Sequence, residues 1–122
     1  MKTILVVDDE FGIVDVLLAA LEDEGYRVLT ASNGRRAMER LAENVPDLII
    51  MDFMMPLLDG AEAGKAIRGD PATASIPIIM MSALPEPAVR KRFDGYQIFL
   101  RKPFLIPALL ESMAAVFQAA SR

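Results

Sequence analysis

The sequence contains no cysteine, no histidine and no tryptophan. Without cysteine the chain can form no disulfide, thiolate metal site or thiol nucleophile, and such a composition is typical of a reducing compartment. Without histidine no imidazole can act as a general base or a zinc ligand, which excludes Ser-His-Asp triads and histidine-bound zinc. Any chemistry must therefore use carboxylates, hydroxyls, lysine, backbone groups or a hard metal ion held by oxygen.

Export signals and long apolar segments are also lacking. The apolar run at residues 4–7 ends at an acidic residue and is too short for the core of a signal peptide. The longest uncharged stretch, residues 71–85, is interrupted by prolines, which exclude a membrane-spanning helix. We therefore expect a cytoplasmic protein with no membrane partner.

The composition that is present favours one folded domain. The 122 residues are 53% hydrophobic and 25% charged, a balance that supports a core and differs from that of disordered chains. At roughly 100 to 200 residues per domain, we expect a single domain over residues 1–122. The net charge of −4 argues against direct binding to nucleic acid.

Apolar residues follow the spacing of strands and of helices in alternation along the whole chain. Short apolar runs predict five strands, at about residues 4–7, 27–31, 47–51, 76–81 and 97–100. Helical spacing runs from Val14 to Leu21, and from Ala37 to Leu41 after a predicted turn at Asn33-Gly34. Three further helices are expected at about residues 61–68, 86–93 and 106–117.

This alternation predicts an α/β fold, a doubly wound five-stranded parallel sheet with helices on both faces. In such sheets ligands bind beyond the carboxyl ends of the strands. The candidate site residues are therefore the polar residues that follow the apolar runs: Asp8, Asp9, Glu10, Asp52, Ser82 and Lys102.

These residue types suit phosphoryl chemistry. Carboxylates gathered at one edge repel each other, and a divalent cation relieves that repulsion. Oxygen ligands of this kind suit Mg²⁺, which retains waters and binds phosphate oxygens. Lys102 and Ser82 offer a positive charge and a hydroxyl to a phosphoryl group, and Asp52 is the best available nucleophile.

Each of these residues also has an ordinary structural interpretation. Asp8-Asp9 suits the N-terminus of a helix, where carboxylates interact with the helix dipole. Ser82 suits a turn, and Lys102-Pro103 suits an exposed loop. The functional interpretation depends on their coincidence, because all of them are expected at the same edge of the sheet.

In this order, the motifs resemble the response regulator receiver domain of two-component signalling, including the single-domain architecture of chemotaxis-type members. The resemblance covers the whole chain and is carried by Val7-Asp8-Asp9-Glu10, Pro46-Asp47-Leu48-Ile49-Ile50-Met51-Asp52, Met55-Pro56, Asp59-Gly60, Ile76-Pro77-Ile78-Ile79-Met80-Met81-Ser82-Ala83 and Lys102-Pro103-Phe104. It implies a flavodoxin-like fold with strand order 2-1-3-4-5. It also implies a receiver domain over residues 1–122 with no output domain.

The resemblance implies a role for each site residue. Asp52 would accept a phosphoryl group from a sensor histidine kinase or a phosphotransfer protein. Mg²⁺ would be held by Asp9, Asp52 and the backbone carbonyl of Met54, with Asp8 acting through water. Lys102 would pair with the phosphoryl oxygens. Ser82 would move to bond the phosphoryl group, and Phe99 stands at the position of the switch aromatic. An unknown downstream protein would recognise the changed surface.

The sequence departs from the commonest family pattern at three positions. Met54 and Leu84 stand where polar residues are frequent, and Phe99 replaces a commoner tyrosine. The stretch between Ser82 and Gly95 is about two residues shorter than expected, so the fourth helix is expected to be short or displaced. These differences bear on the kinetics and the output of signalling.

A basic group is the candidate partner surface. Arg90, Lys91 and Arg92 are expected on the fourth helix and Arg101 after the fifth strand, which border the switching face in the resembling family. We expect them to attract an acidic partner, because basic groups at a rim raise association rates. The competing interpretation is an ordinary solvated helix face.

Three alternatives stay open alongside the phosphorylated receiver. The chain could be a receiver-like interaction module that is never phosphorylated, or the excised receiver of a longer regulator. It could also be a phosphatase or mutase of the haloacid-dehalogenase type. Enzymes of that type carry a second aspartate two residues after the nucleophile, and that position here is Met54. We therefore expect no enzyme activity beyond the transfer and loss of its own phosphoryl group.

Overall fold

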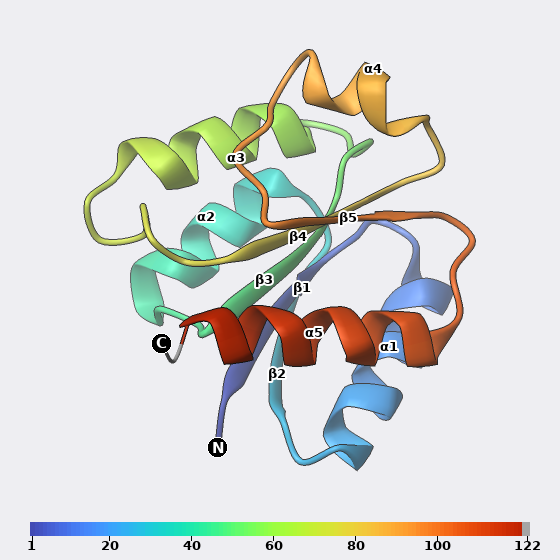
Figure 1. Ribbon diagram of the computed structural model, residues 1–122. Helices are drawn as coiled ribbons and strands as arrows, with labels where there is room; N and C mark the ends of the chain where they lie inside the picture. Colours follow the sequence, from blue (N-terminus) through green and yellow to red (C-terminus); the bar gives the residue numbers. More distant parts are fainter. Residues whose placement is uncertain (121–122) are drawn as a thin grey trace.

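Five strands form one parallel sheet in the order β2-β1-β3-β4-β5, which confirms the doubly wound α/β prediction (Figure 1). A computed structural model describes residues 1–120 of the protein. The strands are β1 (Thr3–Val7), β2 (Arg27–Ala31), β3 (Leu48–Asp52), β4 (Ile78–Ser82) and β5 (Ile98–Arg101). The helices are α1 (Phe11–Asp23), α2 (Gly34–Glu43), α3 (Gly60–Gly69), α4 (Glu86–Arg90) and α5 (Ile106–Ala120).

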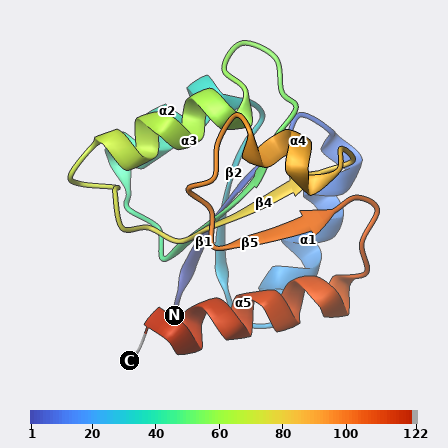
Figure 2. The same cartoon turned by 45° about the horizontal axis from the view of Figure 1, so that its top comes forward.

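The sheet separates two hydrophobic cores because successive side chains of a strand point to opposite faces. Leu5 and Val7 of β1 belong to the core shared with α2, α3 and α4, whereas Ile4 and Val6 belong to the core shared with α1 and α5. Figure 2 shows α1 and α5 on one face of the sheet and α2 and α3 on the other. This two-sided burial explains why the strands are continuous apolar runs in the sequence.

The central strands place buried polar groups only at their carboxyl ends. Every residue of β3 and β4 is buried, and both strands are apolar until their last residue, Asp52 in β3 and Ser82 in β4. A buried carboxylate is costly unless it is paired or bound to a cation. The fold thus holds Asp52 in a position that requires such a partner.

Most predicted boundaries agree with the structure to within two residues. The predicted turn at Asn33-Gly34 is instead the start of α2, because the side chain of Asn33 accepts a hydrogen bond from the backbone of Arg36 at 2.8 Å. β4 begins at Ile78 rather than residue 76, since Pro77 has no amide hydrogen to donate to a neighbouring strand.

The fourth helix is short, as the length of the Ser82 to Gly95 stretch suggested. Its predicted range of residues 86–93 was too long, because α4 ends at Arg90. Beyond this end, Phe93 turns inward and is only 7% exposed. A Cβ atom on Gly64 would lie 2.6 Å from the Phe93 ring, so the ring packs against a position that only glycine fits. The Phe93 amide still donates to the Val89 carbonyl at 3.1 Å, so α4 passes into a turn that keeps Phe93 beside the buried Val89.

Within residues 1–120, no helix combines the length and the apolar character that crossing a membrane requires.

Candidate functional site

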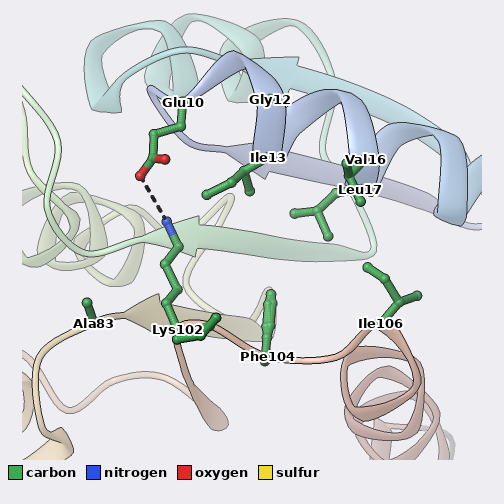
Figure 3. A pocket seen from close by; sticks show the side chains of 10 residues that line it. Glu10, Gly12, Ile13, Val16, Leu17, Ala83, Lys102, Phe104 and Ile106 are labelled. Atoms are coloured by element: carbon green, nitrogen blue, oxygen red, sulfur yellow. Dashed lines mark ion pairs between the residues drawn. The ribbon is translucent and has the colours of Figure 1, made fainter.

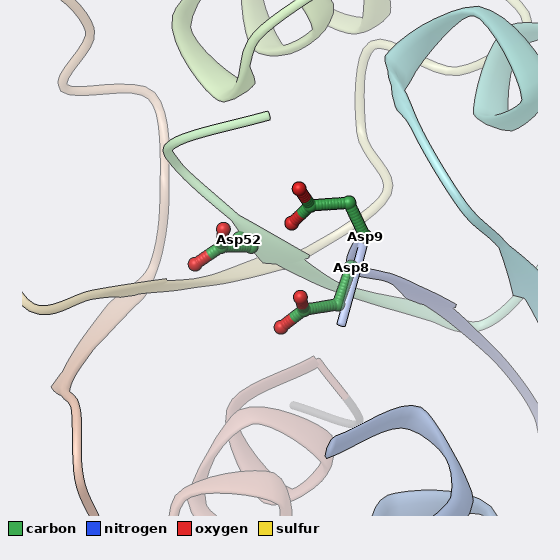
Figure 4. A group of neighbouring side chains, drawn as sticks. All are labelled: Asp8, Asp9 and Asp52. Carbon is green, nitrogen blue, oxygen red and sulfur yellow. The ribbon is translucent and has the colours of Figure 1, made fainter. Parts of the chain in front are cut away.

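The carboxyl ends of the strands bring the predicted site residues together at one edge of the sheet. Asp8 directly follows β1, Asp52 ends β3, Ser82 ends β4 and Lys102 directly follows β5. Figure 4 shows Asp8, Asp9 and Asp52 gathered at this edge. One carboxylate oxygen from each of these three residues lies within 4.8 Å of the other two. The predicted acidic cluster is therefore present in the structure.

Lys102 is the cation of the cluster. Its Nζ lies 2.8 Å from Asp8 Oδ2 and 2.9 Å from Asp52 Oδ1, with Glu10 Oε1 at 3.8 Å. Its side chain is only 14% exposed, and the Asp8 and Asp52 side chains are almost fully buried. One lysine cannot neutralise three carboxylates, so the site keeps an excess of negative charge.

Burial and the charges of the cluster both alter the pKa of Asp52. Burial is the largest cause of a rise in its pKa from 3.8 to about 6, to which the charges of Asp8 and Asp9 add while Lys102 opposes the rise. Burial likewise disfavours the charge of Lys102, but its hydrogen bonds to Asp8 and Asp52 prevail and raise the lysine pKa. Asp52 is thus mostly ionised at neutral pH, but its buried charge lowers the free energy of unfolding.

Asp8 and Ser82 also make local contacts. The second oxygen of Asp8, Oδ1, accepts a hydrogen bond from the backbone of Glu10 at 3.0 Å. The hydroxyl oxygen of Ser82 accepts one from the backbone of Leu84 at 3.1 Å, and Ser82 is completely buried. Ser82 therefore also makes the turn contact that its structural interpretation predicts.

The loop between β3 and α3 lies directly against the backbone that carries Asp52. The amide of Gly60 donates to the carbonyl of Phe53 at 2.8 Å. A Cβ atom at Gly60 would lie 2.7 Å from Phe53 Cα and 2.8 Å from the Asp52 carbonyl oxygen, so this approach requires glycine. Met54 follows Phe53 in this loop and is 58% exposed.

The position of the switch aromatic is partly buried. Phe99 packs at the edge of the core that contains α4. Its ring centroid lies 6.1 Å from that of Tyr96, and the Tyr96 hydroxyl donates to Glu86 of α4 at 2.8 Å. Nothing in the sequence pattern signals this contact between Tyr96 and Glu86.

The predicted basic surface differs from the expectation in two respects. Only Arg90 lies on α4, while Lys91 and Arg92 lie in the turn that follows it. Arg101 is the last residue of β5 rather than a residue after it. Arg90 is also paired with Glu86, and Arg92 with Asp59. Arg101 Nε donates to the Ala83 carbonyl at 3.3 Å. Three of the four cations are thus engaged within the protein, which their sequence spacing did not reveal.

An apolar groove of about 450 Å³ opens beside the acidic cluster. Figure 3 shows Ile13 and Val16 of α1 facing Phe104 and Ile106 across it, with the side chain of Lys102 at one end. The peptide bond between Lys102 and Pro103 at this end is cis. The groove thus places an apolar surface next to the cation of the cluster.

The fold and the acidic edge define a doubly wound α/β protein of the receiver class. The chain matches the family described as "Response regulator receiver domain" over residues 4–114. The chain therefore belongs to the response regulator receiver domain family of two-component systems. Domains of this family are signalling modules that interact with histidine kinases and phosphotransfer proteins.

Curated relatives give the same family and are longer than this chain. The phosphate regulon transcriptional regulatory protein PhoB of Pseudomonas aeruginosa is 36% identical over 121 residues, which cover 96% of this chain and 52% of that protein. The alkaline phosphatase synthesis transcriptional regulatory protein PhoP of Bacillus subtilis is 41% identical over 110 residues, which cover 84% of this chain and 43% of that protein. The chain thus spans about half the length of these relatives.

Solved structures give the same fold. The signal receiver domain of a signal transduction histidine kinase from Syntrophus aciditrophicus has a TM-score of 0.92 at 30% identity, covering 100% of this chain and 94% of that one. The chemotaxis protein CheY4 of Vibrio cholerae has a TM-score of 0.90 at 33% identity, and the match covers 95% of this chain and 98% of that one. These neighbours support the five-stranded receiver architecture along the whole described chain.

Proposed function

We propose that Asp52 accepts a phosphoryl group from a phosphohistidine on a sensor kinase or phosphotransfer protein, in a reaction that requires Mg²⁺. The observation that carries this proposal is the position of Asp52, buried at the end of β3, 2.9 Å from Lys102 and within one cluster with Asp8 and Asp9. A buried carboxylate beside Lys102, in an acidic cluster able to hold Mg²⁺, suits the acceptance of a phosphoryl group, because the two cations offset the charge of the phosphoryl oxygens.

The transfer uses few protein groups. A carboxylate oxygen of Asp52 attacks phosphorus, the phosphorus–nitrogen bond of the donor breaks, and its electron pair returns to the imidazole nitrogen. The product is an acyl phosphate on Asp52. Lys102 Nζ lies 2.9 Å from Asp52 Oδ1, and in the product Lys102 would exchange this ion pair for one with the phosphoryl oxygens. In this proposal the donor protein binds against the apolar groove beside Lys102.

The donor set of the cluster fits Mg²⁺. Asp8, Asp9 and Asp52 offer carboxylate oxygens within 4.8 Å of one another, and hard oxygen donors of this kind are the ligands that Mg²⁺ takes. We assign direct ligation to Asp9, Asp52 and the Met54 carbonyl, and contact through water to Asp8, whose oxygens already bond Lys102 and the Glu10 amide. When bound, the ion neutralises charge on the phosphoryl oxygens.

We further propose that Ser82 and Phe99 respond to the phosphoryl group. Ser82 would exchange its bond from the Leu84 amide for one with the phosphoryl oxygens, and Phe99 would follow the shift of the chain after β4. Arg90, Lys91, Arg92 and Arg101 remain the proposed surface for an unknown downstream protein. Among the described residues, Arg90 and Arg92 form ion pairs and Arg101 donates to the Ala83 carbonyl, whereas the Lys91 side chain makes neither kind of bond and is the most available to an acidic partner.

The phosphorylation proposal is tested with a small phosphodonor. Incubation with acetyl phosphate and Mg²⁺ is expected to add one phosphoryl group, seen by intact-mass measurement and lost on treatment with hydroxylamine. Asp52→Ala is expected to stay unmodified, whereas Asp15→Ala, which removes an exposed carboxylate of α1, is expected to react normally. The same mass increase in Asp52→Ala would refute the assignment. A wild type that never reacts would favour the unphosphorylated interaction module.

Magnesium binding is expected to depend on Asp9. Asp9→Asn removes one of few hard ligands, and we expect Mg²⁺ affinity to fall by at least about tenfold, because the ion is then held mostly by water. The measurement is the midpoint of amide chemical-shift changes during Mg²⁺ titration. Glu10→Gln is the matched control, since Glu10 is the next acidic residue but lies outside the cluster. An unchanged midpoint in Asp9→Asn would contradict the ligand assignment.

A further inference from the structure

Arg92 joins the chain after α4 to the loop that follows Asp52. Its Nη2 lies 2.8 Å from Asp59 Oδ2, at the start of α3. Its guanidinium carbon also lies 5.3 Å from the centre of the Phe53 ring, in the geometry of a cation–π contact. Phe53 is the residue next to Asp52 and is only 1% exposed. One side chain therefore contacts both ends of the segment that connects β3 to α3.

Each end of this segment is attached to a rigid element. Asp59 caps α3, since its Oδ1 accepts from the Glu62 amide at 2.9 Å while its own amide donates to the Glu62 carboxylate at 3.4 Å. Partial burial would raise the pKa of Asp59, but the Glu62 amide and Arg92 prevail and lower it, so the carboxylate stays ionised. The Phe53 amide donates to the Met81 carbonyl of β4 at 2.8 Å. Asp59 thus uses one oxygen for the helix cap and the other for Arg92.

The segment between these ends includes an unfavourable backbone conformation. Leu57 has a φ of 70°, which a leucine seldom adopts because its Cβ crowds the neighbouring carbonyl. Such a residue persists only when surrounding contacts hold the loop in place. The Gly60 amide bond to the Phe53 carbonyl is one such contact, and the Arg92 bridge from Phe53 to Asp59 is a second.

We propose that Arg92 is a positioning residue for the phosphoacceptor site: by clamping Phe53 to Asp59 it fixes the loop that presents the Met54 carbonyl next to Asp52. This inference rests on the proposed function, in which that carbonyl is a Mg²⁺ ligand. It also gives Arg92 a role within the protein that is separate from any downstream partner. Because the clamp comes from the end of α4, the position of α4 and the shape of the metal site are linked.

Two effects of removing Arg92 have opposite signs and can therefore be distinguished. Loss of a positive charge near an anionic site would by itself strengthen cation binding. Loss of the clamp would weaken it, because the loop carbonyl is no longer held in place. Exposed ion pairs contribute little to stability, and Arg92 is half exposed, so the unfolding temperature is expected to change little.

The experiment compares Arg92→Ala with Lys91→Ala in the whole chain. We expect Arg92→Ala to weaken Mg²⁺ binding by about tenfold in an amide chemical-shift titration. The Gly60 amide is also expected to exchange with solvent faster in the metal-free protein, which is a readout independent of Mg²⁺. Lys91→Ala removes a neighbouring positive charge that takes no part in the clamp. This variant is expected to leave the Mg²⁺ affinity and the Gly60 exchange rate unchanged. Unchanged or tighter Mg²⁺ binding in Arg92→Ala, or an equal loss in Lys91→Ala, would overturn the proposal.

Asp59→Asn tests the same clamp from its other end. Asparagine is as good a helix cap as aspartate, so this variant keeps α3 intact while it removes the charge that Arg92 meets. We expect the same loss of Mg²⁺ affinity, and no greater loss when both substitutions are combined, because both remove one interaction. Additive losses would contradict the clamp. If the wild type bound no Mg²⁺ and accepted no phosphoryl group, the proposed function would fail, while Gly60 exchange would still decide whether Arg92 holds the loop.

Discussion

Replacing Asp52 by asparagine is expected to stabilise the metal-free protein by about 2 to 3 kcal/mol near neutral pH, even though it removes the phosphoacceptor. The reason is that burial raises the pKa of Asp52 from 3.8 to about 6. A raised carboxyl pKa means that the folded state disfavours the charge that the unfolded state carries freely. Asparagine has nearly the same shape and carries no charge, so this cost disappears.

The raised pKa of Asp52 determines at which pH the Asp52→Asn variant is more stable than the wild type. Below about pH 4 the carboxyl is protonated in both the folded and the unfolded state, so the wild type and the Asp52→Asn variant differ little in stability. Between about pH 4 and 6 the unfolded state loses its proton first, and the stability of the wild type falls as the pH rises. The advantage of Asp52→Asn should therefore grow through this window and reach its full value above it.

Urea unfolding at about pH 5 and about pH 7.5 measures this difference. Asp15→Asn, which changes an exposed carboxyl on α1, is the control and is expected to leave the free energy of unfolding within about 0.5 kcal/mol of the wild type. Added Mg²⁺ is expected to stabilise the wild type more than Asp52→Asn, because ligand binding to the folded state stabilises it. An Asp52→Asn variant less stable than wild type at neutral pH would contradict the argument.

Polar residues at two positions beside the site are expected to shorten the life of the phosphorylated protein. Hydrolysis of an aspartyl phosphate needs a water in line with the scissile bond, and groups that bond and orient this water accelerate the attack. The side chains of Met54 and Leu84 can do neither. We therefore expect Met54→Asn and Leu84→Glu to speed the loss of phosphate, by about tenfold for the more effective one, which is about 1.4 kcal/mol in the barrier.

The structure ranks the two substitutions. Met54 is 58% exposed near the start of the loop that follows Asp52, whereas Leu84 is partly buried and packs against the core. Met54→Asn is therefore expected to have the larger effect. The measurement is the first-order loss of phosphate from purified phosphoprotein with Mg²⁺. Val45→Asn serves as the control, because Val45 is an exposed apolar residue that precedes β3, at the end of the strand opposite to Asp52. If neither substitution changed the rate, or both slowed it, these side chains would not set the lifetime.

The fold was predictable from the sequence because its determinants are local. Apolar runs such as those of β3 and β4 end at Asp52 and Ser82, and in a parallel sheet every strand delivers its last residue to the same edge. Asp8, Asp52, Ser82 and Lys102 could therefore be assembled into one site before any distance was known. Their residue types then restricted the chemistry to that of a buried anionic cluster with one cation.

The end of α4 and the role of Arg92 were not predictable in this way. Helical spacing continues to residue 93, but α4 ends at Arg90 and passes into a turn, and the Phe93 ring packs against Gly64 of α3. The sequence gives no sign of this contact between α3 and the chain after α4. The sequence shows Arg92 only as one of three consecutive basic residues, whereas the structure pairs it with Asp59, 33 positions away.

The order of the elements, the two-sided burial of the sheet and the acidic edge thus follow from the sequence alone, since these depend on periodicity and on residues at strand ends. Three further properties follow from the packing of the folded chain: the rise that burial causes in the pKa of Asp52, the contacts that hold the loop after it, and the charges that are engaged within the protein. These properties depend on distances between segments that are remote in the chain, and such distances are set by the packing of whole elements rather than by local spacing.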